Sequence, residues 1–297
     1  MIKDRGQIAI LTAFLLVATL ALLGLSVDFS YWVYSKQKIQ DAADLSALAG
    51  AQDLPDKTKA ETSARLYFEK NYGKSVSNVN ITFFNANFGI KVHYRGEVPL
   101  LFMSIFGFPS GVIEGKAEAI GIPLSKPIGI IPIAIFNTTP LVYDQLTTIW
   151  GDVIEPAKGN FGLIDPTNDH TMQNKDLEEW IRNDYKGQKG MPAAKELVYT
   201  NPGLVDGPVS KGFNDRLALG NNYVICPIVD MSKVNGSGQV PIMGFAYFEG
   251  VSCVVTTISG HKVMIEIKGY FRQLLDNKGL VDKTAGYYGI KAVRLMK

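Results

Sequence analysis

The feature that most constrains this chain is an uncharged, largely apolar run near its N-terminus. No charged side chain occurs between Arg5 and Asp28, which leaves Gly6 to Val27 as one stretch. At ~1.5 Å per residue, a helix of this length measures roughly 33 Å and can cross the ~30 Å hydrocarbon core of a bilayer. The helical pattern continues past this run and ends before Pro55, so the sequence predicts one long helix with a membrane half and a water-exposed half.

A cleaved signal peptide is the alternative interpretation of this run. The run is longer than the apolar core of ~7–15 residues that is typical of a signal peptide. The nearest small-x-small cleavage site, Ala47-Leu48-Ala49, lies about twenty residues beyond the run, where cleavage would be unusual. We therefore favour a retained anchor, and the length of the uncharged stretch disfavours the core helix of a soluble protein.

The orientation of the anchor depends on the charges that flank it. Lys3 and Arg5 precede the run, and Lys36 and Lys38 follow it closely, so the positive-inside count is nearly balanced. A short leading tail with a free amine usually stays in the cytoplasm. We therefore expect a single-pass protein of the cytoplasmic (inner) membrane, with its N-terminus inside and its C-terminal domains extracytoplasmic.

A family resemblance begins within the apolar run and continues beyond it. The motifs that carry it are Leu23-Gly24-Leu25-Ser26-Val27-Asp28, Ile39-Gln40, Ala42-Ala43-Asp44 and Ala47-Leu48-Ala49-Gly50-Ala51. In this order and spacing, they resemble the N-terminal segment of Tad (Flp) pilus-assembly proteins of the TadE/TadG type. More loosely, Gly159-Asn160-Phe161-Gly162 and Gly244-Phe245-Ala246 resemble the C-terminal region of TadG-like proteins.

The resemblance implies a non-catalytic, membrane-anchored component of a Tad (Flp) pilus-assembly or secretion machine, either minor pilin-like or an assembly protein. The implied partners are other pilus-assembly or pilin-like subunits and the lipid bilayer, with no nucleic acid, small-molecule substrate or cofactor. Pilin-like precursors are cut after a Gly and typically carry Glu at the fifth mature position. Cutting after Gly6 would place Leu11 there, so the processing of this chain stays open.

Small side chains form one face of the water-exposed half of the helix, where they recur at helical spacing. Such residues let backbones approach closely, either against the protein's own soluble domain or against neighbouring subunits in a helical bundle. The positions that we expect to carry helix packing or interaction are those of the family motif: Gly24, Asp28, Gln40, Ala42, Ala43, Asp44, Ala47, Ala49 and Gly50.

Composition favours a globular protein over a disordered or nucleic-acid-binding one. Hydrophobic residues make up 46% of the 297 residues and charged ones 20%, which is enough to form sizeable cores. The net charge of +2, with lysines and acids interspersed, gives no electrostatic case for nucleic acid. The length suggests an anchor followed by two soluble units.

Residues 55–122 predict a small α+β unit. One amphipathic helix is expected from Lys57 to Tyr72, followed by strands at Val79–Phe83, Ile90–Tyr94 and Val112–Ile120. The stretch from Val98 to Phe106 is almost wholly apolar but too short to span a membrane as a helix. We expect a buried helix there, or a surface that lies on the bilayer or on a partner.

Residues 123–297 predict a β-rich extracytoplasmic domain. Candidate strands are Ile128–Phe136, Leu141–Trp150, Tyr223–Val229, Val240–Phe248, Val251–Ile258 and His261–Tyr270, and candidate helices are Lys175–Tyr185 and Val209–Leu217. The predicted fold class is therefore α+β, with a transmembrane and extended helix over residues 1–54 preceding the two soluble units. Because each unit has apolar strand faces of its own, we expect a chain that begins at Lys57 to fold without the helix.

Two cysteines, Cys226 and Cys253, each lie in an apolar, β-branched run. Two buried thiols are a common structural outcome for such residues. Outside the cytoplasm, a disulfide between them can form where the Cα atoms lie within ~7 Å. The sequence leaves both outcomes open.

Sequence motifs for catalysis or metal binding are sparse. The three histidines, His93, His170 and His261, lie far apart and outside any zinc-binding spacing. Neither Gly-x-Ser-x-Gly, a Walker A loop nor a dinucleotide fingerprint occurs. The Asp165–Asp169 loop clusters oxygen ligands that suit a hard cation, although Asx-turn chemistry explains it more simply. Glu178-Glu179 fits the solvated first turns of a helix better than an acid/base pair.

One loop motif stands apart, Gly159-Asn160-Phe161-Gly162. Its two glycines permit positive φ and close backbone approach, which favours a tight bend that shapes the domain over partner recognition. A second class of function also stays open, a membrane-anchored extracytoplasmic enzyme or ligand-binding protein of unknown specificity. The small-residue helical face favours assembly, whereas the lack of clustered His, Cys or acidic motifs disfavours the enzyme.

Overall fold

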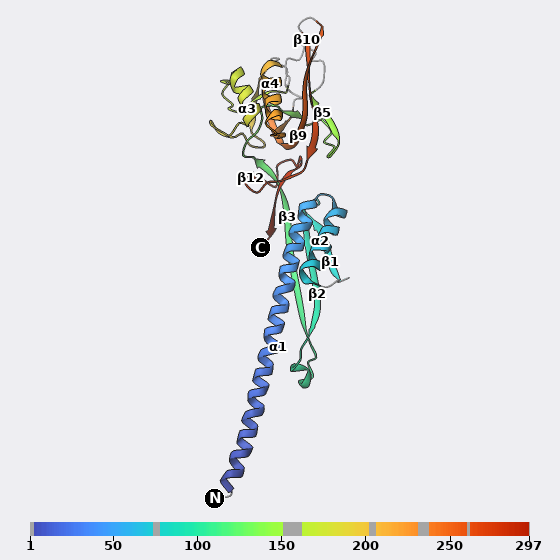
Figure 1. Ribbon diagram of the computed structural model, residues 1–297, viewed down its shortest axis with the longest axis vertical. Coiled ribbons are helices and arrows are strands. Elements are labelled where there is room, and N and C mark those ends of the chain that lie inside the picture. The colour runs from blue at the N-terminus through green and yellow to red at the C-terminus, as the bar shows by residue number, and fades with distance from the viewer. Residues whose placement is uncertain are drawn as a thin grey trace. The chain divides into compact units, whose positions relative to one another are not determined.

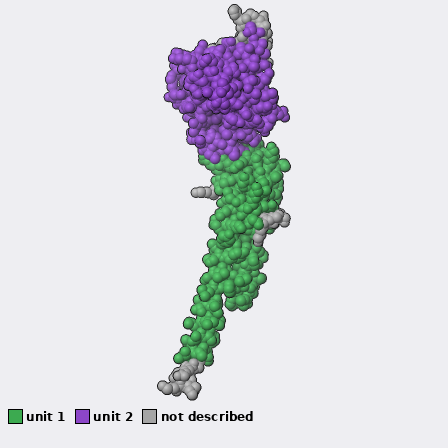
Figure 2. Space-filling view, viewed as in Figure 1, with its two compact units in different colours: residues 1–121, 293–297 green, residues 122–292 purple. Residues whose placement is uncertain are grey.

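The structure is a computed structural model that describes residues 3–73, 78–150, 162–201, 206–230, 238–259 and 262–296. The chain divides into two compact units, residues 1–121 with 293–297 (unit 1) and residues 122–292 (unit 2) (Figure 2). The predicted fold class is confirmed, because a long apolar N-terminal helix precedes a mixed α+β region and a strand-rich C-terminal region.

A single helix, α1, runs from Lys3 to Asp53 (Figure 1). From Gln7 onward it is long and apolar enough to cross a membrane. From Gln7 to Val27 every residue except Gly24 is exposed, a pattern typical of a helix that lies in lipid. The helix ends before Pro55, because a proline disfavours helical backbone at the residue that precedes it.

The second helix of unit 1, α2, spans Lys57–Tyr72, as the sequence predicts. Asp56 caps its N-terminus, where the carboxylate accepts a hydrogen bond from the Lys59 backbone N–H at 3.1 Å. Gly73 ends the helix with a left-handed backbone at φ 78°, a conformation that glycine adopts without steric cost. Local sequence therefore fixes both ends of this helix.

Three strands of unit 1 form an antiparallel meander: β1 (Val79–Phe84), β2 (Gly89–Pro99) and β3 (Ser110–Lys126). The register places Val92 of β2 opposite Ile81 of β1 and opposite Ala117 of β3. All three predicted strands occur, and β2 and β3 extend well beyond their predicted ends. The longer strands carry the β2–β3 hairpin away from the core and alongside α1 (Figure 1).

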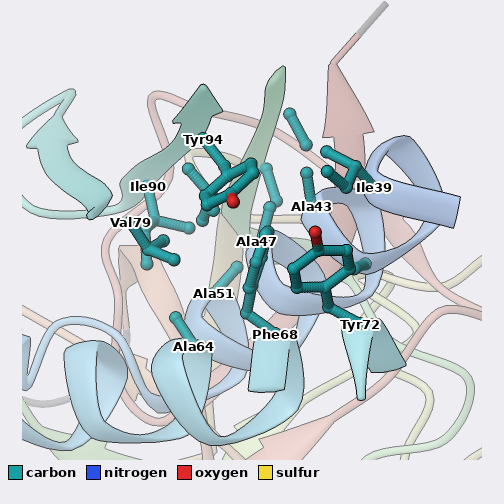
Figure 3. Close-up of a cluster of buried hydrophobic side chains, with 14 of the residues drawn as sticks. Ile39, Ala43, Ala47, Ala51, Ala64, Phe68, Tyr72, Val79, Ile90 and Tyr94 are labelled. Atoms are coloured by element: carbon teal, nitrogen blue, oxygen red, sulfur yellow. The ribbon is translucent and has the colours of Figure 1, made fainter. Parts of the chain in front are cut away.

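The core of unit 1 is shared by α1, α2 and this sheet. Ala43, Ala47 and Ala51 of α1 lie in one cluster with Phe68 of α2 and Tyr94 of β2 (Figure 3). The Phe68 and Tyr94 rings lie 5.4 Å apart, between their centroids. The sequence separates the anchor from the α+β unit at residue 54, but the structure packs them as one body because the small side chains of α1 admit close neighbours.

The apolar stretch from Val98 to Phe106 does not form the buried helix that we expected first. Val98 and Pro99 end β2, and a single 3₁₀ turn, η1 (Met103–Phe106), follows. We call residues 100–109 the hairpin tip, because they connect β2 to β3. Most of its large side chains are exposed, since one short turn buries little, and the alternative of a surface for the bilayer or a partner stays a prediction.

Unit 2 contains a mainly antiparallel sheet with the strand order β4-β8-β9-β10-β5. Its described strands are β4 (Ile135–Phe136), β5 (Leu146–Trp150), β8 (Tyr223–Val229), β9 (Gln239–Ser259) and β10 (Lys262–Arg272), with shorter pieces β6 (Ile164–Asp165), β7 (Leu197–Thr200), β11 (Leu274–Leu275) and β12 (Leu280–Val281). The last strand, β13 (Ile290–Met296), returns the chain to unit 1 at residue 293.

Two predicted features of unit 2 are wrong. The two strands expected on either side of Glu249-Gly250 are one continuous strand, β9. A bulge rather than a turn lies there, because Gly250 pairs with Gly269 of β10 and Ser252 pairs with Lys268, which leaves Val251 as the extra residue. The strand expected over Ile128–Phe136 is reduced to β4 and isolated bridges. Pro132 lacks the N–H that a continuous ladder needs within that stretch.

The helices of unit 2, α3 (Asn174–Asn183) and α4 (Asp206–Ala218), lie close to their predicted spans. Their buried side chains join those of β8, β9 and β10 in one hydrophobic cluster. Arg216 of α4 is almost fully buried, and its guanidinium pairs with the Asp184 carboxylate at 2.9 Å. It also donates to four backbone carbonyls, those of Ile181, Arg182, Asn221 and Tyr223, and so ties α4 to α3 and to the start of β8.

Candidate functional site

The small-residue face of α1 is covered by the chain's own α2 and sheet. Ala42, Ala43 and Ala47 have no exposed surface, and Ala49 is 7% exposed. A side chain at Gly50 would meet the carbonyl of Ala60 at 2.9 Å, which shows how closely the helices approach. The face therefore has a partner within this chain, the first of the two partners that the sequence allows.

Two polar side chains add direction to this contact. The Ser46 hydroxyl donates to the Ala64 carbonyl of α2 at 2.6 Å inside the core. The side-chain amide of Gln40 pairs with the backbone of Lys116 in β3. It donates to the Lys116 carbonyl at 2.8 Å and accepts from the Lys116 N–H at 3.2 Å. The same amide donates to Asp44 at 2.8 Å, so two motif residues hold α1 on β3 together.

Asp28 holds the hairpin tip against α1. Its carboxylate accepts three backbone N–H bonds, from Leu101 at 2.8 Å, Phe102 at 2.8 Å and Met103 at 2.6 Å. These donors open the η1 turn, so the carboxylate caps that turn as an acidic residue caps a helix N-terminus. The side chain is 3% exposed, and the three bonds satisfy a charge that lies directly after the apolar run.

Neighbouring residues complete this contact. A Cβ at Gly24 would lie 2.5 Å from the Phe102 ring, so only glycine lets the ring rest on the helix. One turn beyond Asp28, the Trp32 indole N–H donates to the Val112 carbonyl of β3 at 2.9 Å. Gly24 and Asp28 of the family motif thus converge on the hairpin tip, a role that the sequence does not predict. Two features of the sequence point to this contact: Asp28 is the first charged residue after the apolar run, and the stretch between Glu97 and Glu114 is uncharged.

The loop motif falls almost wholly outside the described residues. Gly159, Asn160 and Phe161 are not described, and only Gly162 is. Gly162 has a positive φ of 75°, and its carbonyl accepts from the Ala134 N–H at 2.6 Å. The tight bend stays a prediction.

The cysteines are two free thiols, and the disulfide outcome is not the one found. Cys226 pairs across from Ala246 of β9, whereas Cys253 lies seven residues further along that strand. At ~3.3 Å per residue the separation is about 23 Å, far beyond disulfide reach. Burial raises the pKa of the Cys226 thiol and raises the pKa of the Cys253 thiol to about 11, so both stay protonated near neutral pH.

The Asp165–Asp169 loop uses its carboxylates for local hydrogen bonds. Asp165 accepts from the Thr167 N–H at 2.9 Å, the Asx turn that the sequence favours. Lys189 donates to Asp169 at 2.7 Å, and this bond, with further ones from Thr167 and Thr171, holds the pKa of the Asp169 carboxyl well below its usual range. Within the described part of the chain, no three His, Cys, Asp or Glu residues group so as to hold a metal ion.

The remaining titratable candidates make surface contacts. Glu178 pairs with Lys211 of α4, and Glu179 pairs with Arg182 within α3, so both carboxylates serve ion pairs on or between these helices. His93 Nε2 lies 2.6 Å from Glu114 Oε1 on the partly exposed face of the β2–β3 sheet. His261 is outside the described residues. None of these residues converges on a common centre.

Residues 6–53 match the family model described as "Putative Flp pilus-assembly TadE/G-like". The resemblance that the motifs indicate is thereby confirmed for this segment, which coincides with α1. Neither the curated proteins nor the solved structures include a match to this chain. Over this segment the chain is similar to pilus-assembly proteins, and the apolar helix within it suggests a membrane anchor.

Proposed function

We propose that the protein is a non-catalytic, single-pass component of a Tad (Flp) pilus-assembly or secretion machine in the cytoplasmic membrane, minor pilin-like or assembly in type. Its N-terminus lies inside, and the chain after Asp28 lies outside. The observation that carries the proposal is the coincidence of the family match, residues 6–53, with α1, Lys3–Asp53. The matched segment thus supplies both the anchor and the helix on which unit 1 is built.

The surfaces left free on α1 indicate where subunits would meet. Because the small-residue face is buried within unit 1, it is not available to a neighbouring subunit. The membrane half instead exposes large apolar side chains all round, among them Leu16 and Leu20 at 55% and 57%. In the proposed assembly, helix contacts between subunits are therefore made in the membrane half. Van der Waals packing between helices, rather than the hydrophobic effect, favours such contacts over contacts with lipid.

Photocrosslinking in the native host tests this assignment. A photoreactive residue at Leu16 or Leu20 should crosslink to other pilus-assembly subunits identified by mass spectrometry, and deletion of the protein should abolish piliation. Leu66 on α2, an apolar residue with comparable exposure, is the matched control outside the membrane half. Normal pili after deletion, with crosslinks only to lipid, would overturn the proposal and favour the extracytoplasmic enzyme or ligand-binding alternative.

Topology and processing are tested separately. Cysteines introduced at Lys57 and Lys189 should react with an impermeant reagent on intact spheroplasts, while Cys226 and Cys253 stay unreactive because they are buried. Protection of both introduced cysteines would contradict the proposed orientation. Mass spectrometry of the membrane-extracted protein should find a retained anchor, with or without loss of Met1 to Gly6. A mature N-terminus at Gly50 would instead show that the run is a cleaved signal.

A further inference from the structure

The hairpin tip carries large apolar side chains that the described residues leave exposed. Leu101 is 73% exposed, Ile105 78%, Phe106 62% and Phe108 59%. No charged residue occurs between Glu97 and Glu114, so the whole tip and both strand ends beside it are uncharged. A soluble protein rarely gathers so many large apolar side chains on one exposed turn without a partner for them.

The position of the tip identifies that partner. Phe102 rests on Gly24, about 5 Å before the end of the apolar run at Val27. The tip therefore stands beside the last turn of the membrane half of α1, at the depth where hydrocarbon gives way to the headgroups. Phe29, Tyr31 and Tyr34 follow on the exposed surface of the helix, and such aromatic side chains are enriched at that level of a bilayer.

We propose that the hairpin tip is a second membrane-contacting element, which inserts its apolar side chains into the outer boundary of the bilayer beside α1. The occupant of this surface is lipid, because the tip continues the apolar surface of the helix and the one charge at their junction, Asp28, is buried at 3% exposure. The inference rests on the membrane anchoring within the proposed function. It adds that unit 1 is held to the bilayer at two points, which fixes its orientation about the helix axis.

The clamp at Asp28 fits this role. An unpaired carboxylate at the hydrocarbon boundary would resist insertion, but three backbone N–H groups of the tip neutralise its hydrogen-bonding demand. The same bonds satisfy donors of the tip that lipid could not satisfy. The contact therefore lowers the free-energy cost of burying the Asp28 carboxylate and the N–H groups of the tip in lipid. It leaves Ile105 and Phe106 on the outer surface of the tip.

Spin-label accessibility in the full-length protein tests the proposal. The protein is reconstituted into phosphatidylcholine–phosphatidylglycerol vesicles with a label on Ile105→Cys, on Phe106→Cys or on two reference positions. Leu15→Cys reports the membrane half of α1, and Leu66→Cys reports an exposed apolar position of α2. Helix α2 contacts α1 through the Ser46–Ala64 hydrogen bond, and Ser46 lies about 27 Å beyond Asp28 along α1. The native thiols are buried, so the unsubstituted protein gives the labelling background.

Labels on the tip should show a ratio of oxygen to aqueous nickel-chelate accessibility several-fold above that of Leu66→Cys and approaching that of Leu15→Cys. Tip labels as open to the chelate as Leu66→Cys would overturn the proposal. Tip labels shielded from both reagents, or broadened by a nearby second label, would also overturn it and point to a protein partner or a second copy. If Leu15→Cys is itself accessible to the chelate, the anchoring fails rather than the tip.

Discussion

The two halves of α1 are one continuous helix with opposite packing. From Gln7 to Val27 its surface is formed by large apolar side chains, nearly all of them exposed. From Ala42 to Ala51 its buried face is made of alanine, serine and glycine, with almost no exposed surface. Among the described residues, the first half packs against the hairpin tip alone, whereas the second half forms one side of the core of unit 1.

The apolar segment and the fold of unit 1 are therefore not separable, because one continuous helix serves both. A membrane helix needs hydrophobicity on every side but no particular face, because lipid packs on all of them. A helix in a soluble core needs one specific face, because its neighbours are fixed. In the second half, the effect of a substitution on stability should therefore depend on the shape of the new side chain. In the first half it should depend on the polarity of that side chain.

Removal of the whole of α1 should have the largest effect. A chain that begins at Lys57 loses six buried core residues of unit 1: Ile39, Ala42, Ala43, Ala47, Ala51 and Leu54. We now expect unit 1 to unfold in it, contrary to the expectation from sequence, whereas unit 2 keeps its own clusters and stays folded. Hydrogen exchange should then show protection confined to residues 122–292.

A chain that begins at Tyr34 is the matched control for that truncation. It lacks the membrane half but keeps every core residue named above, so amides of α2 and β2 should regain protection. If the chain from Lys57 shows protected α2 amides as well, the small-residue face is dispensable for folding, and its contact with other subunits becomes the better explanation.

Ala43→Leu should have the next largest effect. Ala43 is fully buried, and the added carbons have no space in the cluster between α1 and α2. Overpacking of this kind costs about 1–3 kcal/mol, so the melting temperature of unit 1 should fall while that of unit 2 is unchanged. Leu45→Ala, two residues further and 44% exposed, is the control on the same helix. Equal effects of both changes would contradict the packing asymmetry.

Asp28→Ala should have a more local effect at the boundary between the two halves. It leaves the N–H groups of Leu101, Phe102 and Met103 without their acceptor, so the hairpin tip should detach from α1 while the core of unit 1 persists. Faster hydrogen exchange of these three amides is the measurement, compared with Asp41→Asn, whose carboxylate bonds only within α1 in this structure. Unchanged exchange at the tip would show that the carboxylate does not hold it.

Much of the fold could be predicted because local signals decided it. The capped helix Lys57–Tyr72 and the strand Tyr223–Val229 agree with their predicted bounds, since caps and a β-branched run act over a few residues. The bulge beside Gly250, at Val251, could not be predicted, because glycine in a strand marks a turn and a bulge equally well. Only the pairing with β10 distinguishes them.

The contacts of the motif residues could not be predicted from the sequence. The family motif drew attention to Gly24, Asp28 and Gln40, yet their partners lie about 75 residues away along the chain, in the hairpin tip and β3. Helical periodicity shows which side chains share a face and not what covers that face. For the same reason the apolar stretch from Val98 to Phe106 could be recognised as unusual while its conformation could not.

Leu20→Ala should have the smallest effect of all, although it deletes a large apolar side chain. Leu20 is 57% exposed and contributes nothing to the core. In the proposed topology it faces lipid when the protein is alone in vesicles, and α1 stays in the bilayer whether unit 1 is folded or unfolded. The lost burial is therefore the same in both states, and the melting temperature of unit 1 in vesicles should not change measurably. Gly24→Leu, four residues further, should instead displace Phe102 and loosen the tip, because the added side chain enters the space that the ring occupies. Thermal melting and tip hydrogen exchange of the two variants together would decide the comparison: a destabilised Leu20→Ala protein would mean that the membrane half has a specific packing partner after all.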